Sequence, residues 1–235
     1  MEKPQFVEDQ IYHIYNRGVE KRKVFLNKKD YFRFIHDMFE FNDGNPVINN
    51  FNYLNCIKNK KTIEVQPRCN KPRELLVEIL AFVLMPNHFH FLLKQKQENG
   101  ITKFMQKMGT GYTMYFNKKN ERVGSLFQGR FKAVLIEKES HFIYLPSYIH
   151  LNSLDLIDYR GSTSIELEEK LEFLENYRWS SYPDYVGHKN FPSITSRDQY
   201  LGFFGGQDGY KNEIKRLLKE DKKRISEEIK ELTLE

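Results

Sequence analysis

Two apolar runs that flank a short turn constrain the fold of this chain more than any other feature. Residues 75–84 are almost continuously apolar, and residues 88–93 form a second apolar run after the turn Met85-Pro86-Asn87. Apolar runs of this length beside a turn are typical of paired strands inside a sheet. The sequence therefore predicts a central β-hairpin.

The second strand of this hairpin carries two histidines. Because successive side chains of a strand point to opposite faces, His88 and His90 share one face, while Phe89 and Phe91 pack on the other. Two neighbouring imidazoles on one face are suitable ligands for a divalent metal ion. A His-x-His pair alone is more often structural, so this interpretation depends on the other motifs.

Strand and helix patterns alternate on either side of the hairpin. Residues 11–16 and 126–136 are predicted strands, and apolar residues recur at helical spacing over 31–39 and 101–116. The resulting order, βαββαβ, predicts an α+β, ferredoxin-like domain whose helices cover one face of an antiparallel sheet. The other face would then be free for a site.

A third helix is predicted after the last strand. Ser140 is a candidate N-cap for a helix that runs to about Asn152, and Pro146 should kink this helix or start it afresh. Tyr148 and Asn152, four residues apart, would lie beside each other along its edge.

The rest of the chain suggests one domain with additions. From Gly205 onward Lys, Glu, Ile and Leu recur in an amphipathic helix. We expect a catalytic domain over residues 1–187, with a loop insertion at about 43–72, and a charged helical tail over 188–235.

Composition favours a nucleic-acid partner. Lys and Arg number 37 against 32 Asp and Glu, and the chain holds 14 Tyr and 19 Phe. Aromatic rings among cations suit unpaired nucleic acid, because bases stack on rings and phosphates meet cations. The low cysteine count, Cys56 and Cys69 only, and the lack of a long apolar stretch lead us to expect a cytoplasmic protein without a membrane partner.

The residues on the predicted third helix complement the two histidines chemically. A tyrosine hydroxyl, with a pKa near 10, is a poor nucleophile unless a cation polarises its target, and a phosphate is such a target. Asn152 could add an oxygen ligand to His88 and His90. Such a site, with open positions, is suitable for Mg²⁺ or Mn²⁺ with Tyr148 as nucleophile.

Four segments form a combination that is far more specific than any one of them. They are Pro86-Asn87-His88-Phe89-His90, Gly124-Ser125-Leu126-Phe127-Gln128-Gly129-Arg130-Phe131, Tyr148-Ile149-His150-Leu151-Asn152 and Tyr177-Arg178-Trp179-Ser180-Ser181-Tyr182. Together they resemble the IS200-like (HUH, single-tyrosine) transposases, and most closely the REP-associated branch. The resemblance runs from about Tyr12 to Tyr185.

The resemblance implies an endonuclease and strand transferase that acts on single-stranded, hairpin-containing DNA with Mg²⁺ or Mn²⁺. It implies that His88 and His90 are metal ligands, that Asn152 completes the metal site, and that Tyr148 forms a 5′-phosphotyrosine intermediate. Members of the family occur as monomers or homodimers, so either state is expected here. It further implies a prokaryotic, nucleoid-associated protein.

Four basic residues flank the predicted sheet and are candidate contacts to DNA phosphates: Arg17, Arg122, Arg130 and Lys132.

Some alternatives for individual residues remain open at this stage. Tyr112 or Tyr115 could compete as nucleophile, although their place in an apolar stripe favours the core. Cys56 and Cys69 could form a zinc site with His36 or His13.

Two rival functions also remain. The βαββαβ order is shared with the RNA-recognition fold, so the chain could be a non-catalytic single-stranded DNA or RNA-binding module in which His88, His90 and Tyr12 line a platform. A metal-dependent phosphodiesterase that uses water would instead leave cleavage independent of Tyr148.

Overall fold

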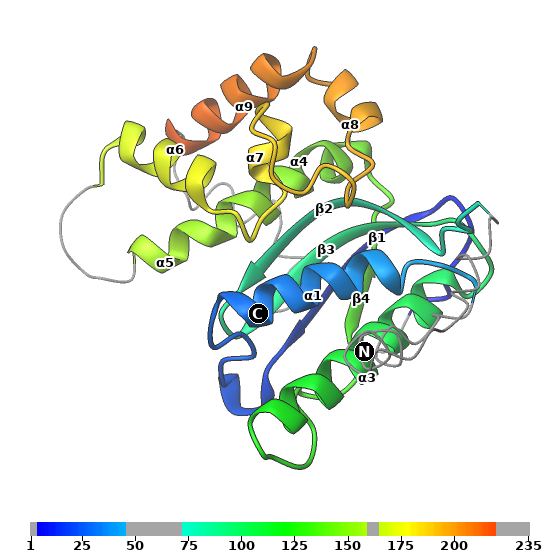
Figure 1. Cartoon of the computed structure of the whole chain (residues 1–235). Coiled ribbons are helices and arrows are strands. Elements are labelled where there is room, and N and C mark those ends of the chain that lie inside the picture. Colours follow the sequence, from blue (N-terminus) through cyan, green and yellow to red (C-terminus); the bar gives the residue numbers. More distant parts are fainter. Residues whose placement is uncertain (1–3, 46–71, 159–164, 220–235) are drawn as a thin grey trace, which may run out of the picture.

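A four-stranded antiparallel sheet forms the centre of the molecule (Figure 1). The computed structural model describes residues 4–45, 72–158 and 165–219. The strand order is β2-β3-β1-β4, as in a ferredoxin-like sheet. The strands are β1 (Ile11–Arg17), β2 (Val77–Met85), β3 (His88–Gln95) and β4 (Lys132–Leu135).

The predicted hairpin is confirmed. β2 and β3 pair along their whole length from Val77↔Gln95 to Met85↔His88, with only Pro86 and Asn87 between them. β1 then pairs with the other edge of β3, so that β3 is an inner strand. The two histidines therefore lie in the interior of the sheet, where the backbone is fixed by hydrogen bonds on both sides.

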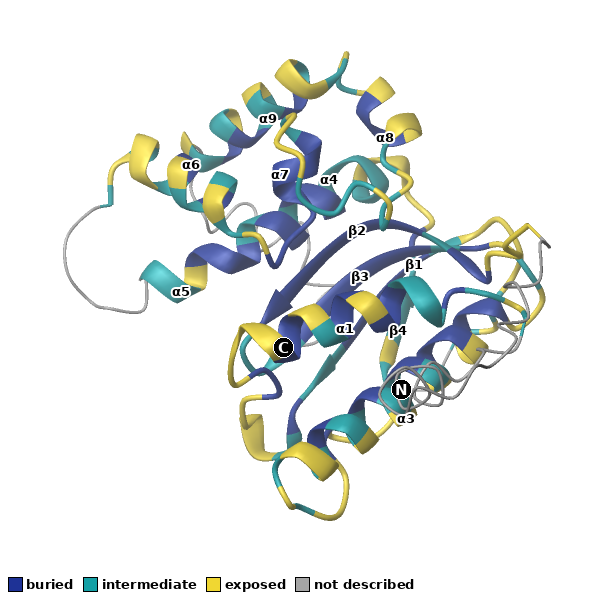
Figure 2. Cartoon of the chain, viewed as in Figure 1, coloured by how far each residue is buried: buried dark blue, intermediate teal, exposed yellow. Residues whose placement is uncertain are grey.

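Two long helices cover one face of the sheet. These are α1 (Lys28–Glu40), which begins with a capping box between Asn27 and Asp30, and α3 (Gly100–Lys119). They bury aromatic and aliphatic side chains, including Phe34 and Phe104, against the even-numbered side of β1 and the odd-numbered side of β3. The fold class, α+β with a βαββαβ order, is thus as the sequence predicts, and the buried strands and helix stripes are visible in Figure 2.

The opposite face carries a further helix, α4 (Glu139–Leu151), which continues into a short 3₁₀ turn η2 (Asn152–Leu154). Leu145 and Ile149 of α4 pack on Leu80, Val83 and other apolar residues of β2 and β3. The sequence predicted that this face would be free. The structure shows instead that α4 partly covers it.

The remaining helices gather beside β2 and around α4 (Figure 1). They bury a second, aromatic-rich cluster that includes Tyr182, Tyr185, Tyr200 and Tyr210. They are α5 (Asp155–Asp158), α6 (Leu167–Asn176), α7 (Tyr182–Tyr185), α8 (Asp198–Gly202) and α9 (Gln207–Lys219). The predicted domain division at 187/188 stays a prediction; α8 and α9 lie beyond it and pack in this cluster.

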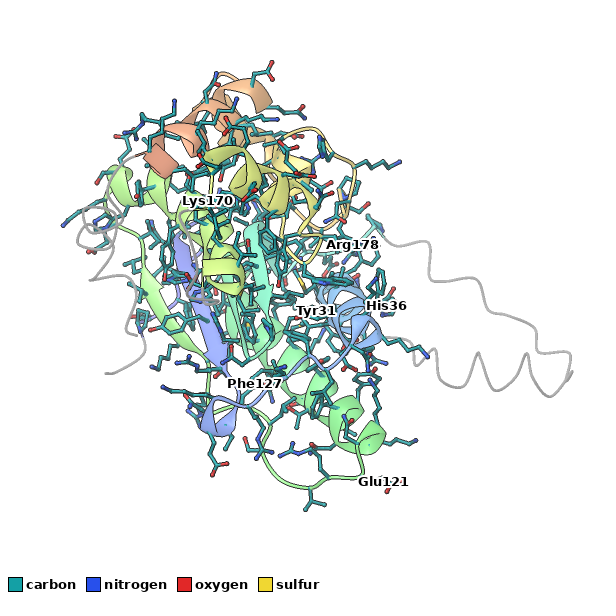
Figure 3. All side chains as sticks on the ribbon, turned by 90° about the vertical axis from the view of Figure 1, so that its left-hand side faces the viewer. Tyr31, His36, Glu121, Phe127, Lys170 and Arg178 are labelled. Atoms are coloured by element: carbon teal, nitrogen blue, oxygen red, sulfur yellow. The ribbon has the colours of Figure 1, made fainter. Side chains whose placement is uncertain are left out.

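The segment before α7 attaches the helical half to the sheet. The amide of Leu84 donates to the carbonyl of Trp179 over 2.8 Å, which extends the β2 edge. The Trp179 ring stacks on Tyr31 of α1, with 4.5 Å between the ring centroids. The guanidinium of Arg178 covers Phe32 beside it, and Tyr31 and Arg178 lie near each other in Figure 3.

Two local predictions are wrong. The last strand begins at Lys132 and not at Leu126, because the preceding residues turn through Gly129, whose φ of 121° does not fit a strand. The N-cap of α4 is the extended residue Lys138 and not Ser140, which lies inside the first turn.

Some predictions concern segments outside the described residues, and one concerns membrane-spanning helices. Most of the loop insertion at 43–72, both cysteines and the tail after residue 219 lie outside the described residues. Over the described ranges, none of the helices combines the length and the apolar character that crossing a membrane requires.

Candidate active site

The two histidines of the His-x-His motif lie on the face that α4 covers. Phe89 and Phe91 point into the core beneath α1 and α3, so His88 and His90 point the other way, as predicted. His90 is 1% exposed, whereas His88, at the start of β3, is half-buried. Their ring centroids are 5.1 Å apart.

His90 is held by a third histidine, His13 of β1. The Nδ1 of His90 and the Nε2 of His13 are 2.9 Å apart, and the two rings stack with centroids 5.1 Å apart. Burial lowers the pKa of His90 well below its ordinary value, and the neighbouring His13, His88 and Arg17 lower it further. His90 is therefore a neutral imidazole at pH 7, and its Nε2 is buried with no hydrogen-bond partner among the described residues.

The orientation of His88 is fixed by the turn residue before it. The Nδ1 of His88 lies 2.7 Å from the Oδ1 of Asn87. A carboxamide oxygen only accepts, so Nδ1 carries the proton and a neutral His88 presents a lone pair at Nε2. Both histidines of the motif thus have one ring nitrogen engaged by a neighbour, which is the usual arrangement around metal-binding histidines.

Tyr148 is placed against these histidines by α4. Its ring meets His90 edge-on with centroids 6.1 Å apart, and meets His13 at 6.4 Å. The placement follows from the helix pattern, because Leu145 and Ile149 bury one side of α4 on β2 and leave Tyr148 on the side that faces the histidines. The structure thus brings together the predicted nucleophile and one predicted metal ligand.

Asn152 follows one turn later and is also buried, with 8% of its surface exposed. Its Nδ2 donates to the carbonyl of Tyr148 over 3.0 Å, so Oδ1 is the atom that could serve as a ligand. Among the described residues, no hydrogen bond or ring contact joins Asn152 to either histidine of the motif. The structure thus places it beside Tyr148, without a hydrogen bond to His88 or His90 among the described residues.

The donor set fits a hard divalent ion with several open positions. Two neutral imidazole nitrogens and one amide oxygen, without a thiolate, are appropriate for Mg²⁺ or Mn²⁺ that also takes water or phosphate oxygens. In the described ranges, three or more His, Cys, Asp or Glu side chains do not come together in a metal-binding arrangement. A third ligand taken from the described residues would therefore be of another kind, as Asn152 is.

Arg17 and Lys132 of the four candidate DNA contacts lie on the same face as the histidines. Arg17 pairs with His88 across β1 and β3, and its Nε is buried without a hydrogen-bond partner in the described part of the chain. Lys132 pairs with Tyr15, and its Nζ lies 5.6 Å from the centroid of that ring. These two cations flank the histidine pair.

Arg122 and Arg130 lie elsewhere. Arg122 donates to Asn117 and to the carbonyl of Ser125, so it holds the loop after α3 in place. Arg130 is exposed and lines a cavity of about 710 Å³ between α3 and the segment before β4, with Phe127 and other aromatic residues.

The structure separates Tyr112 and Tyr115 from the site. Tyr112 is buried beneath α3 and donates to the carbonyl of Val24 over 2.7 Å, and desolvation raises its pKa. Tyr115 donates to Asp30 over 3.0 Å, and its pKa is also raised, with desolvation as the largest cause. Both belong to the α1 and α3 face, as their apolar stripe indicates.

Sequence reasoning missed the role of His13. Alternation along β1 would have placed His13 on the face opposite Tyr12 and Ile14, which are core residues. Its contact with His90 required the pairing register of β1 and β3, which no local pattern gives. Cys56 and Cys69, which the zinc alternative pairs with His36 or His13, lie outside the described residues.

Comparison with known proteins agrees with the motifs. The family model described as "Transposase IS200 like" matches residues 55–152, which is less than half of the chain and includes His88, His90, Tyr148 and Asn152. This match confirms the resemblance to the IS200-like transposases, a family of DNA-cleaving and DNA-transferring enzymes.

Solved structures similar to this chain include two transposases. One is a REP-associated tyrosine transposase bound to a REP hairpin, with 12% identity and a TM-score of 0.49, covering 84% of this chain and 92% of that chain. The other is a putative transposase from Deinococcus radiodurans, with 12% identity and a TM-score of 0.33, covering 69% of this chain and 100% of that chain. No curated protein matches the chain.

Proposed function

We propose that this protein is a metal-dependent endonuclease and strand transferase for single-stranded, hairpin-containing DNA, with Tyr148 as its nucleophile. The observation that carries the proposal is the edge-on approach of the Tyr148 ring to His90, whose Nε2 is buried, neutral and without a partner among the described residues. A buried lone pair without a hydrogen-bond partner is costly unless it has a ligand to bind. Mg²⁺ or Mn²⁺ is the proposed ligand.

His88 and His90 would hold the ion, with Asn152 as the proposed third ligand. Bound there, the ion would supply Lewis acidity at a phosphate oxygen. For His90 to bind through Nε2, its Nδ1 must keep the proton, and His13 Nε2 is placed to accept that hydrogen bond. Arg17 and Lys132, on the same face, are placed to attract the DNA phosphates.

The covalent step is an exchange at phosphorus. The Tyr148 oxygen forms a bond to the scissile phosphorus, the bond from phosphorus to the 3′ oxygen breaks, and the phenolic proton ends on the released 3′-hydroxyl. The product is a 5′-phosphotyrosine, which keeps the phosphodiester energy. Attack by a 3′-hydroxyl on that intermediate rejoins the strand.

The test uses labelled single-stranded hairpin DNA from the flanks of the gene, with Mg²⁺, Mn²⁺ or EDTA. Denaturing protein gels report a covalent adduct, which we expect with either metal, not with EDTA, and not with Tyr148→Phe. Tyr144→Phe, on the same helix, is the matched control and should keep the adduct. Cleavage without an adduct, or an adduct that survives Tyr148→Phe, would overturn the proposal.

One observation weighs against the rival binding module. Tyr12 is fully buried on the α1 and α3 face, opposite His90, so these residues do not form one platform. His13 and Tyr15 on the other face are also buried, and α4 partly covers that face. Base stacking requires an exposed sheet face, which the described residues do not offer here.

A further inference from the structure

The helix that carries Tyr148 has a break in its hydrogen bonding at Pro146. Proline has no N–H, so the carbonyl of Phe142, four residues earlier, cannot receive its usual helical hydrogen bond. In this structure the hydroxyl of Tyr200, on α8, donates to that carbonyl over 2.7 Å and also contacts the carbonyl of Ile143. A side chain from the C-terminal helices thus replaces the hydrogen bond that α4 lacks.

A second connection reaches α4 just after the nucleophile. His150, two residues beyond Tyr148, is fully buried, and burial lowers its pKa to about 3, so that the ring is neutral. Its Nδ1 lies 2.7 Å from the hydroxyl of Tyr210, on α9, and its Nε2 lies 2.7 Å from the hydroxyl of Ser181. Both ring nitrogens are therefore satisfied by residues outside α4.

This connection continues to the sheet. The Oγ of Ser181 accepts from the amide of Phe82, on β2, over 2.9 Å, and donates to the carbonyl of the same residue over 3.2 Å. With that hydrogen used, Ser181 accepts from Nε2–H of His150, and Nδ1 of His150 accepts from Tyr210. A continuous chain of hydrogen bonds thus runs from α9 through α4 to β2.

Tyr148 lies between these two connections, with the Tyr200 contact before it and His150 after it. We infer that α8 and α9 position the nucleophile: Tyr200 and Tyr210 hold α4 against the sheet so that Tyr148 stays at His90. The inference rests on the proposed function, which gives Tyr148 its role. It assigns a task to helices that lie beyond the residues matched by the family model (Figure 1).

The residues that carry this inference are positioning residues, because they act through α4. Leu145 and Ile149 already bury α4 on β2, so the helix does not need these hydrogen bonds in order to form. The hydrogen bonds instead fix the direction of the helix axis. Loss of one such bond should therefore let Tyr148 move away from the histidines while the protein remains folded. Displacements of about 1 Å in a reacting group are enough to slow a reaction strongly.

The test compares two tyrosines that are similarly buried beside His150. Tyr182 and Tyr210 are both fully buried with their rings near His150, at 5.6 and 5.7 Å between centroids, but only the Tyr210 hydroxyl contacts it. The Tyr182 hydroxyl has no hydrogen-bond partner in the described part of the chain. Tyr182→Phe is therefore the matched control for Tyr210→Phe.

Single-turnover adduct formation is measured with saturating hairpin DNA and Mn²⁺, well below the melting temperature of each variant. We expect Tyr210→Phe to lower the rate constant roughly five- to ten-fold, as for the loss of one buried hydrogen bond, with the Kd for DNA unchanged. Tyr182→Phe should keep the wild-type rate constant. Equal rate constants in all three proteins, or equal losses in both variants, would overturn the inference.

Amide hydrogen exchange gives a readout that does not depend on the reaction. Exchange over residues 147–151 should become faster in Tyr210→Phe than in Tyr182→Phe; no difference there would overturn the inference. Should Tyr210→Phe fail to fold, Tyr200→Phe takes its place with the same expectations. A wild-type protein without any adduct would overturn the proposed function alone, because the exchange comparison would still decide whether α9 fixes α4.

Discussion

The two faces of the sheet differ in what they bury. The face under α1 and α3 buries mostly apolar and aromatic side chains, such as Phe91, and the buried carboxylates of Asp30 and Asp37 accept hydrogen bonds there. The face under α4 buries His13 and His90, and α4 itself buries polar groups of its own. Buried polar groups reduce stability unless they are bonded, and on the α4 face the Nε2 of His90 and the Nε of Arg17 are buried without a hydrogen-bond partner among the described residues. This difference indicates that the α4 face is shaped by its chemistry.

The largest expected effect is a loss of stability from a truncation on the face under α1 and α3. Phe91→Ala removes a fully buried ring that contacts Phe34 and Phe89, and should lower the free energy of unfolding by about 3–5 kcal/mol. Urea unfolding followed by circular dichroism measures this. The adduct yield per folded molecule should stay near that of the wild type. A loss of activity without a loss of stability would contradict this distinction between the two faces.

The buried histidines of α4 and of the face beneath it should make the free energy of unfolding depend on pH. An unfolded histidine takes up a proton below its ordinary pKa of 6.5, whereas His150 stays neutral to about 3 and His90 stays neutral well below 6.5. The unfolded state then binds more protons, so the free energy of unfolding falls as the pH falls through 6.5. His150 contributes about 2 kcal/mol between pH 7 and pH 5, and His90 acts in the same direction.

Urea unfolding of the metal-free protein across this pH range measures the effect. His150→Gln, which cannot titrate, should reduce the slope against pH, whereas Phe91→Ala should lower the curve without changing its slope. An unchanged slope in His150→Gln would contradict the assignment of that residue as a buried neutral base.

A smaller effect tests whether His13 supports His90 as a metal ligand. His13→Phe keeps a ring in the stack but removes the hydrogen bond to His90, and should weaken Mn²⁺ binding about 10- to 100-fold. Titration of Mn²⁺ followed by electron paramagnetic resonance measures the Kd directly. His36→Phe, at a surface position on α1, is the control and should leave it unchanged.

The smallest effect concerns DNA affinity. Arg17→Gln should weaken hairpin binding by about 1 kcal/mol and reduce the slope of log Kd against log salt by about one, because it removes one cation beside the histidines. Fluorescence anisotropy over a range of salt concentrations measures both. Arg122→Gln should change the slope less, since that guanidinium is already bonded within its loop.

The sequence predicts the framework better than the contacts between its parts. The order of strands and helices along the chain, the hairpin and the side of the sheet that His88 and His90 occupy follow from alternation and helical periodicity, which are local. Tyr148 could be placed on the edge of a helix for the same reason. His13 could not be placed against His90, because the pairing register is a tertiary property.

The helical half was the least predictable. Pro146 indicates a kink, but nothing near it indicates that Tyr200, over fifty residues later, supplies the missing hydrogen bond. His150 belongs to a recognised motif, Ser181 lies in another, and Tyr210 lies in the amphipathic helix predicted from Gly205, yet none of these patterns indicates that the three side chains meet. Such long-range polar contacts depend on how the helices pack, which periodicity does not specify.

The central claim is that Tyr148 attacks DNA, and mass spectrometry of the trapped adduct tests it most directly. The adduct is formed with Mn²⁺ and hairpin DNA, digested with nuclease and trypsin, and sequenced by fragmentation. The account predicts a nucleotide mass on Tyr148, in the peptide that begins at Glu139. A nucleotide on any other residue, Tyr144 included, would contradict it.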